Sequence, residues 1–233
     1  MFGRRKNGAA EEVDELDAEQ VESEDLTPPP PRPQGPWDEA DAPDDEVNRI
    51  DLGGLLIPVP ADTEVRVDVN PEGEVVAATL VHAESSMQVN AFAAPRSYGI
   101  WAEVRAEIAV ALREGGGRAD DAEGPYGTEL QAQVPSEDGG FTAARFLGVD
   151  GPRWFLRGLL TGPAATDPDA AAPLEAALKN VVVLRGTDPM AVRDPLALLL
   201  PKQVVEAAAE PDTGVDEESL QMPERGPEIT ELR

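Results

Sequence analysis

Apolar residues recur with the spacing of strands and helices only in the middle of this 233-residue chain, and this restriction bounds what can fold. Residues 1–50 carry 15 acidic and 5 basic side chains, and residues 188–233 carry 11 and 4. Consecutive prolines and dense acidic charge leave these ends too little apolar surface to form a core. We therefore expect four parts: a disordered acidic, proline-rich tail over 1–49, a folded domain over 50–187, an apolar extension over 188–209 that packs on the domain, and a disordered acidic tail over 210–233.

The middle of the chain has short strand patterns on either side of one clear helical pattern. Strand signals lie at residues 54–59, 64–69, 73–83, 86–94, 122–134, 141–149, 153–162 and 181–186. The apolar residues at helical spacing are Trp101, Val104, Ile108 and Leu112. Ser97 suits the N-cap of this helix, and Gly115 follows its last turn.

A second helix is expected from Asp167 or Asp169 through Asn180, although Pro173 weakens the helical pattern. Its apolar stripe consists of Leu174, Ala177, Leu178 and Val181. Strands of hairpin length combined with two helices predict an α+β domain, a mostly antiparallel sheet with both helices packed on one face.

The stretch GVDGPRWFLRG, residues 148–158, places two arginines beside a tryptophan in an acidic chain. Side chains alternate along a strand, so Trp154 is expected to face the core while Arg153 and Arg157 face the other way. A three-residue turn over Asp-Gly-Pro would pair Arg145 with Arg157 on that second face. A two-residue turn would separate them, because a slip of one residue moves side chains to the opposite face.

The candidate site that follows is a partner-binding face made of Arg145, Arg153, Phe155 and Arg157, with Arg96 nearby. Arginine is suited to carboxylates, so the face would bind an acidic peptide, the chain's own acidic tail or an anionic ligand. Two alternatives stay open. The arginines could form ordinary surface ion pairs, or the second helix could cover this face, which would make Phe155 a core residue and place the arginines at its rim.

No catalytic, cofactor-binding or metal-binding residues are predicted. His82, the one histidine, lies close to Glu84, Ser85 and Ser86, but residues so near along a strand and turn cannot converge on one substrate atom. We therefore expect an ordinary histidine at a strand end. The chain has no cysteine and matches no metal-binding motif, so no metal or other cofactor is expected.

Charge and composition also bound the location and the partners. No apolar run is long enough for a membrane span, and the basic start MFGRRKNG leads into an acidic stretch, unlike a secretory signal. We therefore expect a cytoplasmic protein that does not contact a membrane. The net charge of −27 repels phosphate backbones, which disfavours nucleic acid as a partner.

Two motifs, FAAPRSYGIWAEVRAEI and GVDGPRWFLRGLLTGPAA, resemble a family of acidic, alanine-rich actinobacterial proteins of unknown function over about residues 48–200. The resemblance implies no established activity and therefore no catalytic residues. The order of strands and helices is also similar to that of PsbP/Mog1-type α+β domains. That similarity implies a module that binds partners, and it says nothing about a site.

The sequence thus predicts a non-enzymatic binding or adaptor domain that engages a protein or peptide. The alternative is a carboxylate- or metal-dependent enzyme with a cleft between sheet and helix, and a nucleic-acid-associated protein is less favoured. The acidic arms are expected to regulate access to the arginines, with phosphorylation of Ser23 or Thr27 strengthening the effect. Trp37, a lone aromatic in the N-terminal arm, is either a docking anchor or an incidental linker residue.

Overall fold

The structure, a computed structural model, describes residues 34–200. One sheet comprises β4 (Glu64–Val69), β5 (Val75–His82), β6 (Ser85–Ala93), β7 (Arg118–Gly124), β8 (Gly127–Pro135), β9 (Phe141–Gly151) and β10 (Trp154–Thr161). A smaller sheet comprises β1 (Trp37–Asp38), β2 (Arg49–Asp51), β3 (Leu55–Pro58) and β11 (Val182–Val183). The helices are α2 (Trp101–Glu114) and α3 (Pro168–Lys179), with short 3₁₀ helices η1 (Glu39–Asp41) and η2 (Gly162–Ala165). The tails predicted over 1–33 and 210–233 lie outside the described residues.

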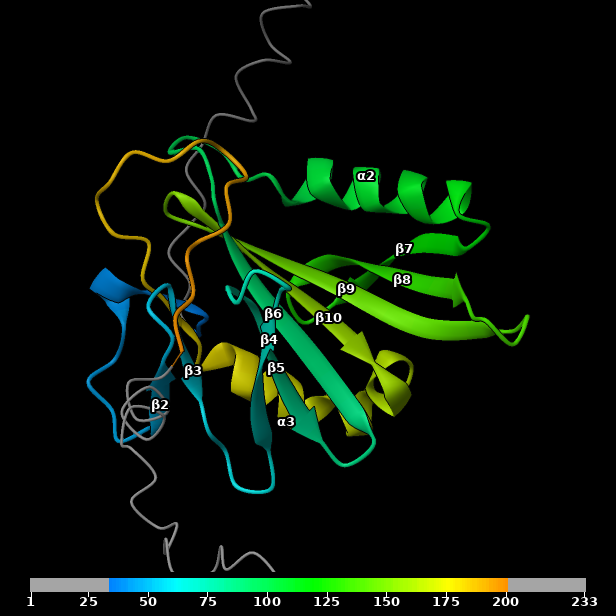
Figure 1. Cartoon of the computed structure of the whole chain (residues 1–233), viewed down its shortest axis with the longest axis horizontal. Helices are drawn as coiled ribbons and strands as arrows, with labels where there is room; N and C mark the ends of the chain where they lie inside the picture. Colours follow the sequence, from blue (N-terminus) through cyan, green and yellow to red (C-terminus); the bar gives the residue numbers. More distant parts are fainter. Residues whose placement is uncertain (1–33, 201–233) are drawn as a thin grey trace, which may run out of the picture. The chain divides into compact units, whose positions relative to one another are not determined.

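The seven-stranded sheet is antiparallel throughout, in the order β4-β5-β6-β10-β9-β8-β7 (Figure 1). Strand β10 therefore lies at its centre, between β6 and β9. The four-stranded sheet has the order β1-β11-β3-β2, in which β1 and β11 are parallel and the other pairs are antiparallel. This arrangement confirms the predicted α+β domain with a mostly antiparallel sheet.

Helix α3 covers one face of the seven-stranded sheet, where the larger apolar core lies. Alternation along β10 directs Trp154, Leu156 and Leu160 to this face, and each is at most 1% exposed. The stripe predicted for the second helix is fully or almost fully buried against them: Leu174, Ala177, Leu178 and Val181. Pro173 lies inside α3 without ending it.

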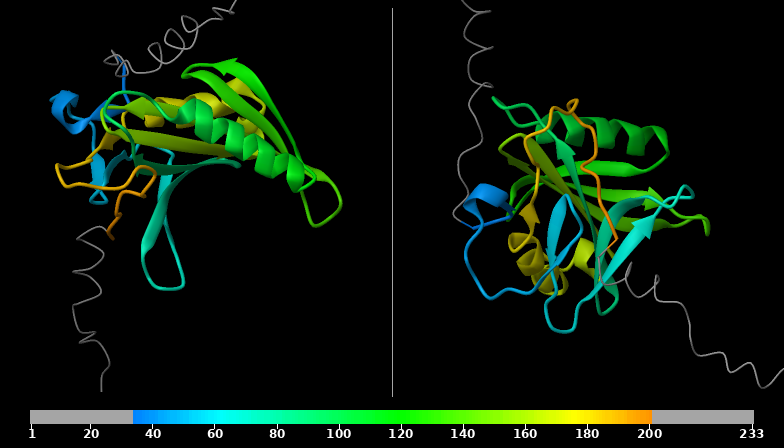
Figure 2. Two further views of the ribbon diagram at one scale, coloured as in Figure 1. Left: turned by 90° about the horizontal axis from the view of Figure 1, so that it is seen from above. Right: turned by 60° about the vertical axis from the view of Figure 1, so that its left-hand side comes forward.

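Helix α2 lies on the opposite face, over β7, β8 and β9 (Figures 1 and 2). Its side chains Trp101 and Ile108 pack with Phe146 and Phe155, which point away from the α3 core. The prediction that both helices share one face is therefore wrong. The central strand β10 carries large apolar side chains on both of its faces, so each face requires its own cover.

The turn between β9 and β10 has two residues, Pro152 and Arg153, and not the three that we predicted. Gly151 pairs with Trp154, which places Arg157 opposite Gly148. The indole of Trp154 lies over Gly151, where an added Cβ would come within 2.1 Å of the ring. Gly151 therefore remains in the strand because a residue without a side chain leaves room for the tryptophan.

Residues 34–49, which we expected in the disordered tail, belong to the fold. The backbone N–H of Trp37 donates to Val181 O (2.9 Å), and β1 pairs in parallel with β11. The Asp38 carboxylate accepts a hydrogen bond of 2.7 Å from Trp154 Nε1. Trp37 is thus a strand residue and does not act as a free linker.

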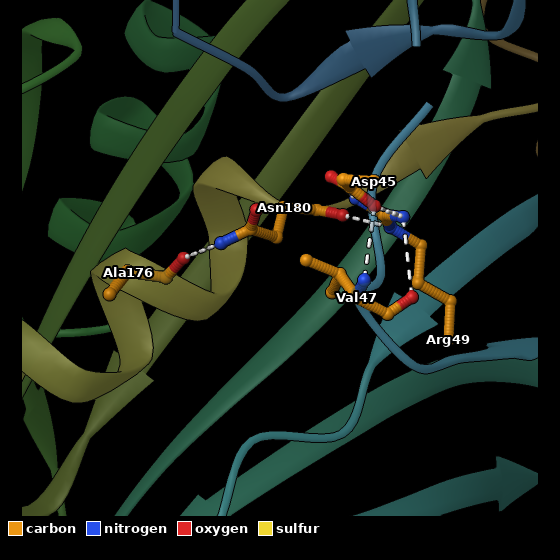
Figure 3. A network of polar contacts seen from close by, with 5 residues as sticks. All are labelled: Asp45, Val47, Arg49, Ala176 and Asn180. Atoms are coloured by element: carbon orange, nitrogen blue, oxygen red, sulfur yellow. Dashed lines mark hydrogen bonds and ion pairs between the residues drawn. The ribbon is translucent and has the colours of Figure 1, made fainter. Parts of the chain in front are cut away.

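A hydrogen bond from Arg49, which also forms an ion pair with Asp45 inside the arm, links this arm to the end of α3 (Figure 3). The Arg49 guanidinium donates to both oxygens of Asp45 (2.7 and 3.0 Å) and, through Nε, to Asn180 O (2.8 Å). The side chain of Asn180 in turn donates to Ala176 O (2.9 Å), within the last turn of the helix. The predicted domain boundary near residue 50 is therefore moved toward the N-terminus.

Residues 188–200, coloured orange in Figure 2, turn at Val192 and Arg193 and then run along the large sheet. The backbone N–H of Leu196 donates to Ala91 O (2.9 Å) in β6. Leu196 and Leu198 are 6% and 7% exposed and join the α3 core. The first part of the expected apolar extension thus supplies core residues, while its remainder, 201–209, lies outside the described residues.

Candidate binding surface

Three aromatic rings form a stack on the α2 side of the sheet. Phe92 lies 6.0 Å from Phe155, and Phe155 lies 5.8 Å from Trp101, measured between ring centroids. A guanidinium group lies over each end, that of Arg157 over Phe92 (5.6 Å) and that of Arg105 over Trp101 (5.7 Å). Phe155 is 1% exposed, so it supports the surface from within the core and cannot contact a partner. A helix does cover Phe155, but it is α2, the first of the two.

The two arginines of this stack differ in their counter-charges. Arg105 donates to both carboxylate oxygens of Asp121 (3.1 and 3.2 Å). Arg157 has no carboxylate partner among residues 34–200, where its Nη2 donates to Asn90 Oδ1 (3.1 Å) and its Nε is buried without a partner. No described residue bonds to its Nη1, so Nη1 is the guanidinium nitrogen that is left for a ligand.

The pKa of the Arg157 side chain lies below its ordinary value because burial penalises the charged form. No described carboxylate acts in the opposite direction. Arg157 is therefore a cation whose desolvation is not offset by an opposite charge within the described chain.

A second pair of cations lies at the turn between β9 and β10. Arg153 occupies the second turn position with a φ of 63°, in the left-handed region that side chains other than glycine rarely adopt. Arg185, which follows β11, has a pKa below its ordinary value because of burial and, second, because of the positive charge of Arg153. Arg185 Nε is also buried without a partner. Sequence reasoning missed Arg185; its signal was a basic residue directly after the apolar run of β11.

Arg96 lies in the exposed loop between β6 and α2. The loop begins beside the same turn, because the backbone N–H of Ala94 donates to Arg153 O (2.9 Å). We use the name arginine surface for Arg153, Arg157 and Arg185, with Arg96 at its margin.

Arg145 does not belong to this surface. The two-residue turn directs its side chain to the α3 face, the opposite side of the sheet from Arg157. There its Nε donates to Glu129 Oε2 (2.6 Å) and its Nη2 pairs with Glu175 Oε1 (2.7 Å). Arg145 is 9% exposed and Glu129 is 2% exposed, so this is a buried ion network. The expected face combining Arg145, Phe155 and Arg157 is therefore corrected.

Burial pulls the pKa of Arg145 downward, but the hydrogen bonds and charges of Glu129 and Glu175 outweigh burial and hold it above its ordinary value. One sheet thus contains an arginine with two carboxylates and, in Arg157, an arginine with none.

Two adjoining cavities lie on the α3 side of β7, β8 and β9. One, of about 200 Å³, is lined by the network of Arg145, Glu129 and Glu175. The other, of about 230 Å³, lies toward Arg118 and shares Gln131 with the first. Glu129 Oε1 is buried with no hydrogen-bond partner in the described chain.

His82 lines neither cavity. Its Nδ1 lies 2.9 Å from the carbonyl oxygen of Asp62, and His82 pairs with Ser85 at the end of the β5–β6 hairpin. Residues 34–200 contain no group of three or more His, Cys, Asp or Glu side chains placed to hold a metal ion. Over the same residues, the helices are too short or too polar to cross a membrane.

These features define an α+β domain whose central sheet carries Arg157, which has no carboxylate partner in the described chain, on one side and a buried ion network beside a polar cavity on the other. The chain belongs to the family described as Protein of unknown function (DUF3710), whose model matches residues 35–207. The match begins just before Trp37, in agreement with the place of the N-terminal arm in the fold. A comparison with curated proteins finds no match, and a comparison with solved structures finds none either. The family prediction is confirmed, while the actinobacterial origin and the likeness to PsbP/Mog1-type domains stay predictions.

Proposed function

We propose that this domain is a non-enzymatic binding module that takes carboxylate groups of an acidic protein or peptide at Arg157. The observation that carries this proposal is a guanidinium partly buried against Phe92 with no carboxylate partner. Burying a cation without an opposite charge costs free energy, and binding residues are found where a protein departs from such rules. A carboxylate at Nη1 would supply the missing charge through a charge-assisted hydrogen bond.

Arg153 and Arg185 extend the proposed surface toward the turn. Arg157 lies four positions after Arg153, which corresponds to about 13 Å in an extended strand. An extended peptide with carboxylates about four residues apart would match this spacing. The partner that we propose is therefore an acidic segment, and the chain's own acidic tail is one such segment.

The test is a titration with the 15-residue peptide EEVDELDAEQVESED, which corresponds to residues 11–25. Chain lacking residues 1–33 is compared with the same chain carrying Arg157→Gln, and peptide binding is followed by fluorescence anisotropy. Loss of one charge-assisted hydrogen bond should weaken binding by about tenfold. Added salt should weaken binding to the unsubstituted chain, because the contacts are partly exposed.

Two controls accompany this titration. Arg118→Gln removes the same charge at an exposed position on the β7 edge and should leave binding unchanged. A peptide with each Glu and Asp replaced by Gln and Asn should bind weakly or not at all. Equal affinity of the Arg157→Gln chain, or equal affinity for the neutral peptide, would contradict the proposal.

The same titration addresses regulation by the acidic N-terminal tail, residues 1–33. If the acidic tail occupies the arginine surface, the full-length chain should bind the peptide more weakly than the chain lacking residues 1–33, because a tethered competitor acts at high effective concentration. The deletion stops at residue 33 because residues 34–49 belong to the fold. Equal affinity of the two chains would contradict the regulation, and it would leave the role of Arg157 to the substitution experiment.

The alternative function, a carboxylate-dependent enzyme, has one observation in its favour. Glu129 and Glu175 line a cavity between the sheet and α3. Both are bound to Arg145, and His82 lies elsewhere. The enzyme, an association with nucleic acid and a cytoplasmic location all stay predictions from the sequence.

A further inference from the structure

The buried ion network on the α3 side of the sheet is incomplete as it stands. Arg145 takes one oxygen from each carboxylate, Glu129 Oε2 at 2.6 Å and Glu175 Oε1 at 2.7 Å. Glu129 Oε1 is left buried without a donor, in a residue that is only 2% exposed. An unsatisfied buried carboxylate oxygen carries a desolvation cost that a bound donor would remove.

Glu129 lines the cavity. An ideal Cβ on Gly124 would come within 2.2 Å of Glu129 Oε1, so the Glu129 carboxylate fits against Gly124 because position 124 has no side chain. Gly124 itself lines the 200 Å³ cavity. The second oxygen of Glu175 also has no described partner and is not buried. Each of the two glutamates thus has one oxygen with no described donor.

The charge of the cavity favours a cation. It is lined by three glutamates, Glu123, Glu129 and Glu175, and by a single cation, Arg145. The N-terminus of α3 lies nearby and would attract an anion, but the Asp167 carboxylate already caps it through Asp169 N (2.9 Å). The balance of formal charge in the cavity is thus negative.

We propose that this cavity binds the guanidinium group of an arginine side chain presented by a protein or peptide. A planar guanidinium can donate to Glu129 Oε1 and to the free oxygen of Glu175 at once, as the guanidinium of Arg145 does with the other two oxygens. Pro125, Ala165 and Pro168 supply apolar wall for the methylene groups. This site is independent of the arginine surface, which lies on the other face of the sheet.

The rest of such a ligand would bind in the adjoining cavity. It has a volume of about 230 Å³ and shares Gln131, Ala165 and Thr166 with the first cavity. Polar side chains such as Gln131 and Gln133 line it and can bond to a peptide backbone. The two cavities together form a polar groove with an acidic end.

The test is an NMR titration of the full-length chain with N-acetyl-arginine amide. Saturable shifts are expected at millimolar concentration for the amides of Gln131 and Thr166 and for the side-chain Nε of Arg145. N-acetyl-citrulline amide has the same shape without the charge and should bind at least about tenfold more weakly. N-acetyl-lysine amide, which lacks the planar fork, should bind more weakly than the arginine probe.

The variant that tests the contact is Glu175→Gln, which changes the less buried carboxylate and leaves Glu129 with Arg145. It should weaken binding of the arginine probe by about tenfold. Glu137→Gln removes an equal charge in the exposed turn between β8 and β9 and should have no effect. The amide spectrum of each variant shows whether it is folded before any titration is interpreted.

Three results would overturn the assignment. They are equal shifts with citrulline, unchanged affinity in a folded Glu175→Gln chain, and stronger shifts at the same amides with Mg²⁺ or Ca²⁺ than with the arginine probe. None of these results would bear on the peptide titration at Arg157, so the two proposals are tested independently of each other.

Discussion

At the scale of single residues, Arg145 and Arg157 show how differently one side chain is held on the two faces of one sheet. Arg145 is bound by Glu129 and Glu175, whereas Arg157 rests on Phe92 and bonds to Asn90. Both guanidinium groups are largely withdrawn from water, but only Arg145 has its desolvation offset by opposite charge. Replacing Arg145 and replacing Arg157 should therefore change the free energy of unfolding by different amounts.

Replacing each arginine by methionine tests this difference. Arg145→Met should lower the free energy of unfolding by about 3 to 5 kcal/mol, because it leaves the Glu129 carboxylate buried without its cation. Arg157→Met should cause no loss, since it removes an uncompensated cation and gives up only one hydrogen bond to a neutral amide and a contact with Phe92 worth about 0.5 to 1 kcal/mol. Urea unfolding followed by tryptophan fluorescence measures both changes. A loss for Arg157→Met as large as that for Arg145→Met would show that Arg157 has a structural role.

At the scale of elements, the start of α2 is set by a residue far away in the sequence. The Asp150 carboxylate accepts hydrogen bonds from the backbone N–H groups of Ile100 (2.8 Å) and Trp101 (3.3 Å). Gly99 allows this approach, because a Cβ there would come within 2.4 Å of the carboxylate. Asp150 thus caps the N-terminus of α2, the role that we predicted for Ser97.

Asp150→Ala should lower the free energy of unfolding by about 1 to 2 kcal/mol through loss of this cap. The backbone amides of Ile100 and Trp101 should also exchange with solvent faster than in the unsubstituted chain. Asp138→Ala, in the exposed turn between β8 and β9, is the matched control and should change neither quantity. Unchanged exchange at the start of α2 would mean that the carboxylate does not hold this end of the helix.

The existence and type of most elements could be predicted from local patterns, but their mutual placement could not. The stripe of Leu174, Ala177 and Leu178 identified α3 because burial requires helical spacing whatever the partner is. The register of β9 and β10 could not be predicted, because it depends on Gly151 making room for the indole of Trp154.

The same limit explains the errors at the candidate site. A turn shorter by one residue moved Arg145 to the other face, and Arg185 comes near Arg153 only through the pairing of β11 in the small sheet. The arm was assigned to the tail because its composition is acidic and proline-rich. Its pairing with β11 and its contact with Trp154 are long-range and leave no periodic signal.

At the scale of the whole molecule, the acidic arm contributes to the large core through one side chain. Asp38 is the hydrogen-bond acceptor of Trp154 Nε1 (2.7 Å), although 116 positions separate them. Trp154 is 1% exposed, so its indole N–H depends on Asp38 for its hydrogen bond. An exposed-looking acid in a proline-rich stretch is therefore part of the tertiary structure.

Asp38→Ala should lower the free energy of unfolding by about 1 to 3 kcal/mol, the cost of leaving a buried donor without a partner. Asp44→Ala, an exposed acid of the same arm, is the control and should have little effect. Urea unfolding measures both variants, and the emission of Trp154 should change only in the first. Equal stability of the two variants would indicate that the arm contributes nothing to the core.

The place of β1 in the small sheet also has a consequence for synthesis on the ribosome. Its one strand neighbour is β11, so Trp37 must wait for Val182 before it can pair. At about 5 to 20 residues per second, the delay is roughly 7 to 30 s. The large sheet is translated within this interval, so the nascent arm can pair with β11 only after all strands of the large sheet have been synthesised.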